Sequence, residues 1–329
     1  MKLLFIGGSG IISSACSALA VDRGLDLYLL NRGRTTRRPV PAGAKVLTGD
    51  IRNPSVAEVL RDHTFDVVVD WVAYSPGHIA TDLELFRGRV GQFIYISSAS
   101  AYQKPPAVLP ITEETPLDNP FWDYSRDKIA CEAALMEAYS QEGFPVTIVR
   151  PSHTYDRTLL PFHGGYTYLD RMLKGKPILI HGDGTSLWTL THHRDFARAF
   201  LGLFGESRAI GEAYHITSDE WLTWNEIARL LGEAAGVEPT VVHVPSDTVA
   251  ALDPHWGPSL LGDKSHCAIF DNSKIRGIVP GFKAETPFAE GAREIAGWYA
   301  ANPAEQRPDA AFDAILDRII AAQLSAQTR

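Results

Sequence analysis

The stretch FIGGSGIIS, residues 5–13, constrains the fold of this chain more than any other. It lies between an apolar run and a segment of helical character, and Gly7, Gly10 and Ser13 fit the spacing G-x-x-G-x-x-small. Glycines at such a junction allow a tight turn and a close approach of a ligand to the backbone, and the following helix N-terminus attracts phosphate. A triplet of this kind is weak evidence for a dinucleotide site when it stands alone. At the first strand–helix junction of a chain with further strands, it predicts a dinucleotide-binding turn.

Strand-like and helix-like segments alternate after this turn. Helical segments are predicted at Ile12–Arg23, Ser55–Asp62 and Asp123–Glu142. The first, fourth and fifth strand-like runs are apolar almost throughout, as strands buried on both faces of a parallel sheet must be. Alternation over about 150 residues predicts a doubly wound α/β parallel sheet, the Rossmann type. The six strand-like runs are 2–7, 26–31, 44–50, 65–73, 92–98 and 145–151.

The pattern changes after Pro151, where loops rich in Gly, Pro, His and Trp take over. Helical segments return at 224–235, 287–301 and 309–324. We therefore expect a dinucleotide-binding domain over residues 1–160 and a smaller α+β substrate domain, mainly over residues 161–329. The segment 188–217 is expected to cross back to the first domain.

Composition and charge exclude several classes of protein. With 45% hydrophobic and 21% charged residues, the chain has the composition of a globular protein. A net charge of −8 argues against broad binding to nucleic acids or anionic membranes. A secretory signal needs roughly 7–15 consecutive apolar residues, and a membrane-spanning helix needs about 18. Neither kind of run is found in the sequence. Three widely spaced cysteines argue against a disulfide framework or a zinc site, so a cytoplasmic protein without a metal is expected.

The end of the second strand bears on cofactor choice. Asn31 stands about twenty residues after the glycine turn, where an NAD enzyme normally carries a carboxylate for the ribose 2′-OH. Arg32 follows at once, with Arg34 close behind. We expect a preference for NADP over NAD, with Arg32 on the 2′-phosphate; the alternative is a solvated basic loop. Asp50, at the end of the third strand, is a candidate partner of the adenine amino group.

Six motifs resemble, in order and spacing, the extended short-chain dehydrogenase/reductase superfamily, in its NAD(P)-dependent epimerase/dehydratase branch. They are GGSGIIS, GDIRN, WVAY, YISSASAY, YSRDK and IVRPSHTY. The segment HITSDEWLTWNEIARLLG and the NRG after the second strand resemble a narrower subgroup, which includes chloroplast stem-loop-binding proteins and uncharacterised bacterial oxidoreductases. Two positions depart from the family pattern: Ser13 replaces the third glycine, and Asn31 replaces the acidic residue.

The resemblance implies that Ser98, Tyr124 and Lys128 are catalytic. Tyr124 and Lys128 are four residues apart and share a helix face. A phenol has a pKa near 10, and we expect the Lys128 ammonium and an oxidised nicotinamide to lower it. Tyr124 then exchanges a proton with the substrate oxygen that Ser98 holds, and Lys128 also binds the nicotinamide ribose. The alternative is that Ser98 is an ordinary turn residue at a strand end and that Tyr124 and Lys128 form a pair on the surface.

Further contacts are expected along the same edge of the sheet. His153 is expected to contact both the cofactor and the substrate. The alternative is that this histidine has a structural role only. The segment Asp253–Gly257 is a candidate lid, with ordinary loop packing as the alternative, and His192–His193 lacks neighbours at metal-ligand spacing. Expected substrate contacts are Tyr74, Gln103, His153, Trp188 and His192. Expected cofactor contacts are Gly7, Ser9, Gly10, Ile11, Ile12, Asn31, Arg32, Asp50, Ile51, Val72, Ala73, Tyr124, Lys128, Pro151 and His153.

The residues after Ser98 narrow the reaction. A 4,6-dehydratase resembling the family would carry Asp-Glu there, and a decarboxylase would carry Glu at the position of Ser100; this chain has Ala99 and Ser100. The favoured reading is an NAD(P)-dependent oxidoreductase or epimerase that acts on a hydroxyl or carbonyl of a sugar or nucleotide sugar. The resemblance also implies a homodimer through the helix 123–142. A non-catalytic cofactor-sensing or RNA-binding protein is the alternative.

Overall fold

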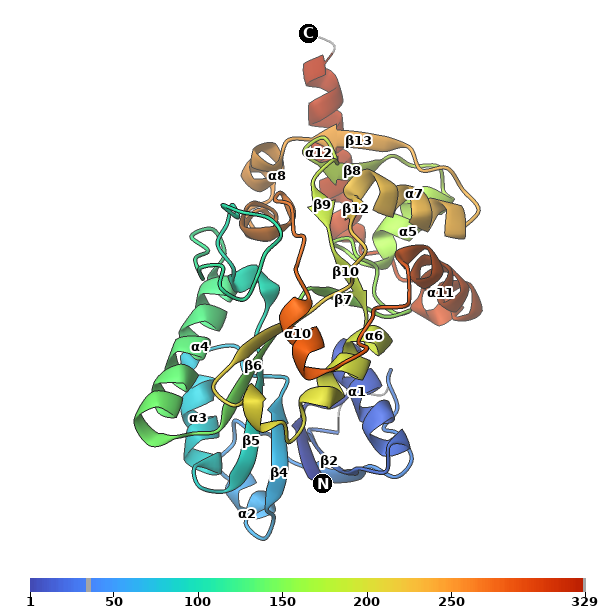
Figure 1. Ribbon diagram of the computed structural model, residues 1–329. Coiled ribbons are helices and arrows are strands. Elements are labelled where there is room, and N and C mark those ends of the chain that lie inside the picture. The colour runs from blue at the N-terminus through green and yellow to red at the C-terminus, as the bar shows by residue number, and fades with distance from the viewer. Residues whose placement is uncertain (34–36, 328–329) are drawn as a thin grey trace.

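A computed structural model describes residues 1–33 and 37–327 of the chain. Its centre is a seven-stranded sheet in the order β11-β6-β5-β4-β1-β2-β3 (Figure 1). Every pair of neighbouring strands in this sheet is parallel, which confirms the predicted doubly wound α/β fold. The strands are β1 (Lys2–Ile6), β2 (Asp26–Asn31), β3 (Lys45–Thr48), β4 (Phe65–Asp70), β5 (Val90–Ile96), β6 (Val146–Pro151) and β11 (Ala213–Ile216).

Helices cover both faces of this sheet (Figure 1). Residues of α1 and α6 belong to the hydrophobic core on one face, and residues of α2, α3 and α4 belong to the core on the other. Leu3, Phe5 and Val67 contribute to the first core, and Leu4 and Val68 to the second. The central strands are thus buried on both sides, as their apolar runs predict. The helices are α1 (Ile11–Asp22), α2 (Val56–Leu60), α3 (Pro76–Phe86), α4 (Asp123–Glu142) and α6 (His193–Phe200).

The rest of the chain builds a third core beyond the carboxyl ends of the sheet strands. Trp224, Tyr168 and Leu316 are among its fully or almost fully buried members. Three two-stranded sheets lie in this half or join it to the first: β10 with β7, β12 with β9, and β13 with β8. These strands are β7 (His153–Tyr155), β8 (Ile178–His181), β9 (Leu187–Trp188), β10 (Leu190–His192), β12 (Leu222–Thr223) and β13 (Val241–Val244).

The helices of this second half surround its small sheets (Figure 1). Nowhere in residues 1–33 and 37–327 is there a helix both long and apolar enough to cross a membrane. The α-helices are α5 (Tyr166–Leu173), α7 (Trp224–Ala234), α8 (Ser246–Leu252), α9 (Gly257–Ser259), α10 (Ser273–Ile278), α11 (Phe288–Ala301) and α12 (Ala310–Gln327). Short helical turns are η1 (Ala99–Ala101), η2 (Leu201–Leu203), η3 (Ser207–Ala209), η4 (Leu260–Lys264) and η5 (Pro303–Glu305).

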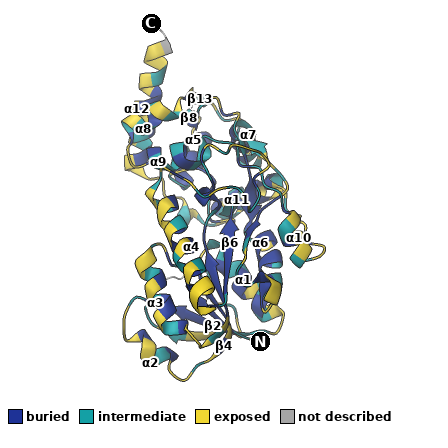
Figure 2. Cartoon of the chain, turned by 60° about the vertical axis from the view of Figure 1, so that its left-hand side comes forward, coloured by how far each residue is buried: buried dark blue, intermediate teal, exposed yellow. Residues whose placement is uncertain are grey.

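Helix α4 has the bounds that the sequence predicts, Asp123–Glu142. It ends at Gly143, whose φ of 70° lies in the left-handed region that favours glycine. Its inner face buries Lys128, Glu132 and Leu135. Figure 2 shows that exposed residues gather along the outer side of α3 and α4. The helix therefore presents one polar, buried stripe to the end of the sheet.

A buried ion pair ties α4 to that end of the sheet. Arg150, near the end of β6, donates from Nη2 to Oε2 of Glu132 at 2.6 Å, and the two side chains are 6% and 3% exposed. The hydroxyl of Ser97 also donates to the Glu132 carboxylate. The guanidinium lies 4.9 Å from the ring centroid of Tyr102. This cluster therefore holds α4 in place against the carboxyl ends of β5 and β6.

We predict that Glu132→Ala lowers the free energy of unfolding by about 3–5 kcal/mol, because it leaves the Arg150 guanidinium buried without its counter-charge. Urea unfolding measures this loss. Glu137→Ala, on the exposed side of the same helix, should cost less than about 0.5 kcal/mol. The double variant Glu132→Leu with Arg150→Met should recover most of the loss. An equal effect of Glu132→Ala and Glu137→Ala would contradict a structural role for the pair.

Candidate cofactor and active site

A cavity of about 750 Å³ opens at the carboxyl ends of β1, β4, β5 and β6. One wall comes from the sheet: the turn after β1, the loop after β4, the end of β5, the start of α4, and Pro151–Thr154. The opposite wall comes from the second half of the chain, with Leu159–His163, Trp188 and Asp263–Lys264. Ligands of open α/β sheets bind at this edge. The cavity therefore lies where the fold places its chemistry.

The glycine turn forms the floor of one end of the cavity. Gly7 has a φ of +90°, and a Cβ atom there would lie 2.5 Å from Cγ1 of Val72. Two hydrogen bonds explain why a serine stands at position 13 of the motif. Its hydroxyl accepts from the N–H of Gly10 at 2.7 Å and donates to the carbonyl of Gly7 at 3.0 Å. The first turn of α1 carries no acidic residue. A dinucleotide pyrophosphate fits this open helix N-terminus.

The loop after β4 is shaped by a buried carboxylate. Asp70 is fully buried, and its Oδ1 accepts the backbone N–H groups of Val72 and Ala73, the latter at 2.9 Å. Arg52 donates to the other oxygen at 3.0 Å. Val72 lines the cavity, whereas Ala73 is buried beneath it and turns its carbonyl toward Lys128. The carboxylate thus sets the course of a loop in which cofactor contacts are expected.

Lys128 lies at the centre of the sheet-side wall. Its Nζ donates to the carbonyls of Ala73 and Ile96, both at 2.8 Å, and the residue is only 2% exposed. The ammonium also lies 4.8 Å from the ring centroid of Tyr95 and 5.8 Å from that of Tyr124. Burial lowers the pKa of Lys128 to about 8. Two of its three N–H groups are engaged, which leaves one for a ligand.

Tyr124 and Ser98 meet on the same wall. The two hydroxyl groups are close enough for the Ser98 side chain to favour tyrosinate, yet burial outweighs this and raises the pKa of Tyr124 to about 12. That the Lys128 ammonium and an oxidised nicotinamide together lower the pKa of Tyr124 stays a prediction; in the structure the ammonium is held by two carbonyls. The phenol therefore keeps its proton at neutral pH. Ser98 also hydrogen-bonds Ser100 at 2.9 Å, and Ser125 donates to Ser100 at 2.8 Å.

His153 reaches the cavity as a neutral ring. The indole Nε1 of Trp188 donates to its Nδ1 at 3.1 Å, so Nε2 carries the ring proton. Burial, helped by the nearby Lys264 ammonium, lowers the pKa of His153 to about 3. Both His153 and Trp188 line the cavity. The pair therefore offers a fixed, uncharged hydrogen-bond donor.

The adenosine-binding residues expected from the sequence lie away from this cavity, at neighbouring strand ends. Nη1 of Arg32 is 3.9 Å from Oδ2 of Asp50, and both side chains are largely exposed, at 61% and 43%. Asn31 ends β2 and pairs in register with Thr48 of β3. Arg34 falls outside the residues that the structure describes. The exposed Arg32 and Asp50 are thus side by side and open to a ligand.

The structure gathers most of the expected contacts at the cavity. Among the expected substrate residues, Tyr74, His153 and Trp188 line it, whereas Gln103 and His192 do not. The His192 ring instead packs toward α11, with Nε2 3.3 Å from Glu294. The expected cofactor residues that line the cavity are Gly7, Gly10, Ile11, Ile12, Val72, Tyr124, Lys128, Pro151 and His153. The others are Ser9, Asn31, Arg32, Asp50, Ile51 and Ala73.

Other lining residues carried no signal in the sequence. Trp122, Asp263 and Lys264 all reach the cavity. None belongs to a recognisable motif, and the last two are brought in only by the packing of the second half. The segment considered as a lid is divided: His255 lines the cavity, whereas Trp256 is buried with its ring stacked on that of His163.

The chain is similar to a large set of known proteins. The model of the NAD dependent epimerase/dehydratase family matches residues 3–217. A chloroplast stem-loop binding protein of 41 kDa (b) from Arabidopsis thaliana is 27% identical over 259 residues, covering 74% of this chain and 65% of the relative. A UDP-glucose 4-epimerase from Lactobacillus helveticus is 32% identical over 168 residues, covering 46% and 51%. The chain thus spans about two thirds of the length of the stem-loop binding protein and about half of the length of the epimerase.

Other similarities run along almost the whole chain. A 2′-dehydrokanamycin reductase from Streptomyces kanamyceticus is 24% identical over 315 residues, covering 91% of this chain and 84% of the relative. The structure of a UDP-glucuronic acid 4-epimerase from Bacillus cereus, in complex with UDP-glucuronic acid and NAD, superimposes with a TM-score of 0.75 at 20% identity. It covers 92% of this chain and 99% of that chain. At this identity the likeness establishes the fold.

We predict that His153 does not titrate between pH 5 and pH 8 in the folded protein, because its pKa is lowered to about 3. The unfolded chain takes up this proton near pH 6.5, so stability falls as the pH drops from about 6.5 toward 3. NMR of ¹³C-labelled histidine measures the titration, with the urea-unfolded protein as reference. A folded-state midpoint above pH 5 would show that the ring is not enclosed in this way.

Proposed function

The chain belongs to the NAD-dependent epimerase/dehydratase family, and we propose that it is an NAD(P)-dependent oxidoreductase or epimerase. Its substrate is a sugar or a nucleotide sugar, at whose hydroxyl or carbonyl group the reaction occurs. The observation that carries the proposal is the meeting of Ser98, Tyr124 and Lys128 in one cavity with the open glycine turn. The names of several relatives, which are epimerases, dehydratases and a reductase of sugar-containing compounds, support the same class.

The chemistry assigns a task to each side chain. A bound nicotinamide ring supplies or accepts the hydride. Tyr124, protonated at neutral pH, donates its proton to the substrate oxygen when a carbonyl is reduced. Oxidation runs from the tyrosinate form, which takes the hydroxyl proton as the hydride leaves the same carbon. Ser98 donates a hydrogen bond to the same oxygen and holds it in place. Lys128 uses its remaining N–H to hold the nicotinamide ribose, while the first turn of α1 receives the pyrophosphate.

Elimination of water is disfavoured, although dehydratases are among the relatives. Ala99 supplies no acid, and Ser100 is occupied with the hydroxyls of Ser98 and Ser125. Among the described residues that line the cavity, Asp263 is the one carboxylate. Its two oxygens face the ammonium groups of Lys104 and Lys264, at 3.2 and 3.7 Å.

The proposal also covers assembly and location. α3 and α4 lie side by side at the edge of the molecule, and Ala130 and Ala133 of α4 are exposed there (Figures 1 and 2). We infer a homodimer through this surface, in the cytoplasm. One relative is named for stem-loop binding, which keeps an RNA-binding role as the second candidate. The net charge of −8 and the complete Ser-Tyr-Lys set favour the enzyme.

We predict that the protein binds NADPH at least tenfold more tightly than NADH, a difference of about 1.4 kcal/mol. Asn31 replaces the carboxylate that would repel a 2′-phosphate, and Arg32 follows it. Arg32→Ala should remove most of the difference by weakening NADPH while leaving NADH unchanged. Calorimetric titration measures both affinities. Arg229→Ala, an exposed arginine on α7, serves as the control. Equal affinities in the parent protein, or a preference for NADH, would refute the assignment of Arg32.

We predict that Tyr124→Phe lowers turnover by at least two decades, since general acid–base catalysis contributes about 10²–10⁴-fold. NADPH affinity should barely change, because the phenol acts on the reacting oxygen. Lys128→Met should lose turnover and also weaken NADPH binding, because its ammonium holds the ribose. Steady-state kinetics and cofactor titration separate the two effects.

The exposed neighbour Asp127 provides the matched control for these variants. Asp127→Asn should leave both turnover and cofactor affinity as they are in the parent protein. Circular dichroism shows whether Lys128→Met remains folded. A folded Lys128→Met protein that binds NADPH as tightly as the parent would mean that the pair does not face the cofactor.

A further inference from the structure

The turn η4 (Leu260–Lys264) brings a second ammonium group into the cavity. Lys264 lies between two aromatic faces, with Nζ 5.4 Å from the ring centroid of Trp122 and 5.8 Å from that of Trp188. Its side chain is 18% exposed and lines the cavity. The turn is π-helical, a rare geometry that is frequent at functional sites. No motif in the sequence assigns a role to it.

Several contacts fix this turn against the catalytic wall. The side-chain amide of Asn119 donates to the carbonyls of Gly262, at 2.6 Å, and Ser100, at 2.8 Å. A Cβ atom on Gly262 would lie 2.9 Å from Cβ of Trp122, so only glycine permits this approach. The carbonyl of Lys264 hydrogen-bonds Nε2 of His181 at 2.9 Å. The lysine is thus held at the cavity by its backbone.

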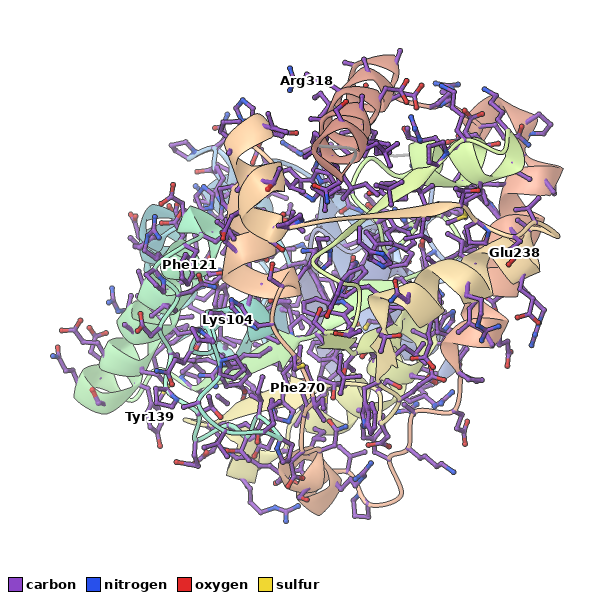
Figure 3. All side chains as sticks on the ribbon, turned by 90° about the horizontal axis from the view of Figure 1, so that it is seen from above. Lys104, Phe121, Tyr139, Glu238, Phe270 and Arg318 are labelled. Atoms are coloured by element: carbon purple, nitrogen blue, oxygen red, sulfur yellow. The ribbon has the colours of Figure 1, made fainter. Side chains whose placement is uncertain are left out.

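The ammonium of Lys264 is incompletely paired. Its nearest carboxylate oxygen, Oδ2 of Asp263, is 3.7 Å away, which is longer than a hydrogen bond. The other oxygen of Asp263 is 3.2 Å from Nζ of Lys104, whose side chain is 1% exposed. Figure 3 labels Lys104 between Phe121 and Phe270, on the side of the molecule where α4 begins. Two ammonium groups share one carboxylate, so this cluster carries a net positive charge.

Such an arrangement is costly unless a ligand completes it. Removing an ammonium from water carries a large penalty, which a single shared carboxylate offsets only in part. Lys128 adds another positive charge to the same cavity, and Asp263 is the one carboxylate among its described lining residues. The cavity therefore favours an anionic ligand over a neutral one.

We propose that Lys264 binds an anionic group, a carboxylate or a phosphate, on the sugar-like substrate. That the substrate is sugar-like rests on the proposed function. That it carries an anionic group rests on the positive charge of the cluster around Lys264. The rings of Trp122 and Tyr124 are 4.8 Å apart, so Lys264 lies one aromatic ring away from the proton donor. The bound anion thus lies close to the reacting carbon. A neutral sugar leaves the Lys264 ammonium without a partner.

The test compares three probes of similar size on the NADP⁺-saturated protein: glucuronate, glucose 6-phosphate and glucose. Isothermal calorimetry should show at least one anionic probe binding tenfold or more tightly than glucose. Lys264→Met should abolish that preference, whereas Lys264→Arg retains a substantial part of it. Lys174→Met changes an exposed lysine directly after α5 and should behave as the parent. The relative affinities of the first two probes distinguish a carboxylate from a phosphate.

Two results would overturn the proposal: anionic probes that bind no more tightly than glucose, or a preference that survives Lys264→Met. Circular dichroism and NADP⁺ affinity show whether the Lys264 variants are folded, and Lys264→Gln replaces Lys264→Met if the latter is not. Failure of the proposed function has a different signature. Anion binding would then depend on Lys264 while no sugar in the panel reduces NADP⁺ or is epimerised.

Discussion

The ammonium group of Lys128 binds the carbonyls of Ala73 and Ile96, and the candidate site depends on this contact. The two carbonyls belong to the loop after β4 and to the last residue of β5, and the lysine belongs to α4. One buried cation thus joins three elements at the carboxyl edge of the sheet. It places Tyr124, one helical turn earlier, against the same edge. Because its own hydrogen-bond needs are largely met by backbone, the cation can be buried and still offer one N–H to a ligand.

The same edge is supported by further buried charges, and each has a partner. Glu132 joins Arg150 and Ser97 one turn beyond Lys128, and Asp70 holds the loop that contains Ala73. Burial of these groups costs free energy, which their mutual contacts offset. What the network provides is a rigid wall on which hydroxyl and ammonium groups keep their separations. The cluster around Lys264 on the opposite wall differs, since its positive charge exceeds its negative charge.

Local patterns in the sequence predict the sheet-side wall well. The apolar strands, the glycine turn and the bounds of α4 all depend on interactions between residues near one another in the chain. Ser13 shows the limit of a motif: the sequence predicts a small residue, and the structure shows its hydroxyl bridging Gly10 and Gly7. The pKa of Tyr124 could not be foreseen, because it depends on how much water the folded chain excludes.

The opposite wall could not be predicted, because tertiary packing alone creates it. Asp263 and Lys264 follow Tyr124 by more than a hundred residues, and nothing in their neighbourhood repeats a known spacing. The need for glycine at position 262 is visible only once Trp122 lies against it. For the same reason His192, next to candidate pocket residues in sequence, turns toward α11 instead of the cavity.

The most direct test of the central claim is a crystal structure of the protein with NADPH. The pyrophosphate should lie at the first turn of α1, and the nicotinamide ring should lie beside Tyr124. Nζ of Lys128 should be within about 3 Å of a hydroxyl of the nicotinamide ribose. A dinucleotide bound elsewhere, or a nicotinamide ribose out of reach of Lys128, would show that Lys128 and Tyr124 do not form the cofactor site.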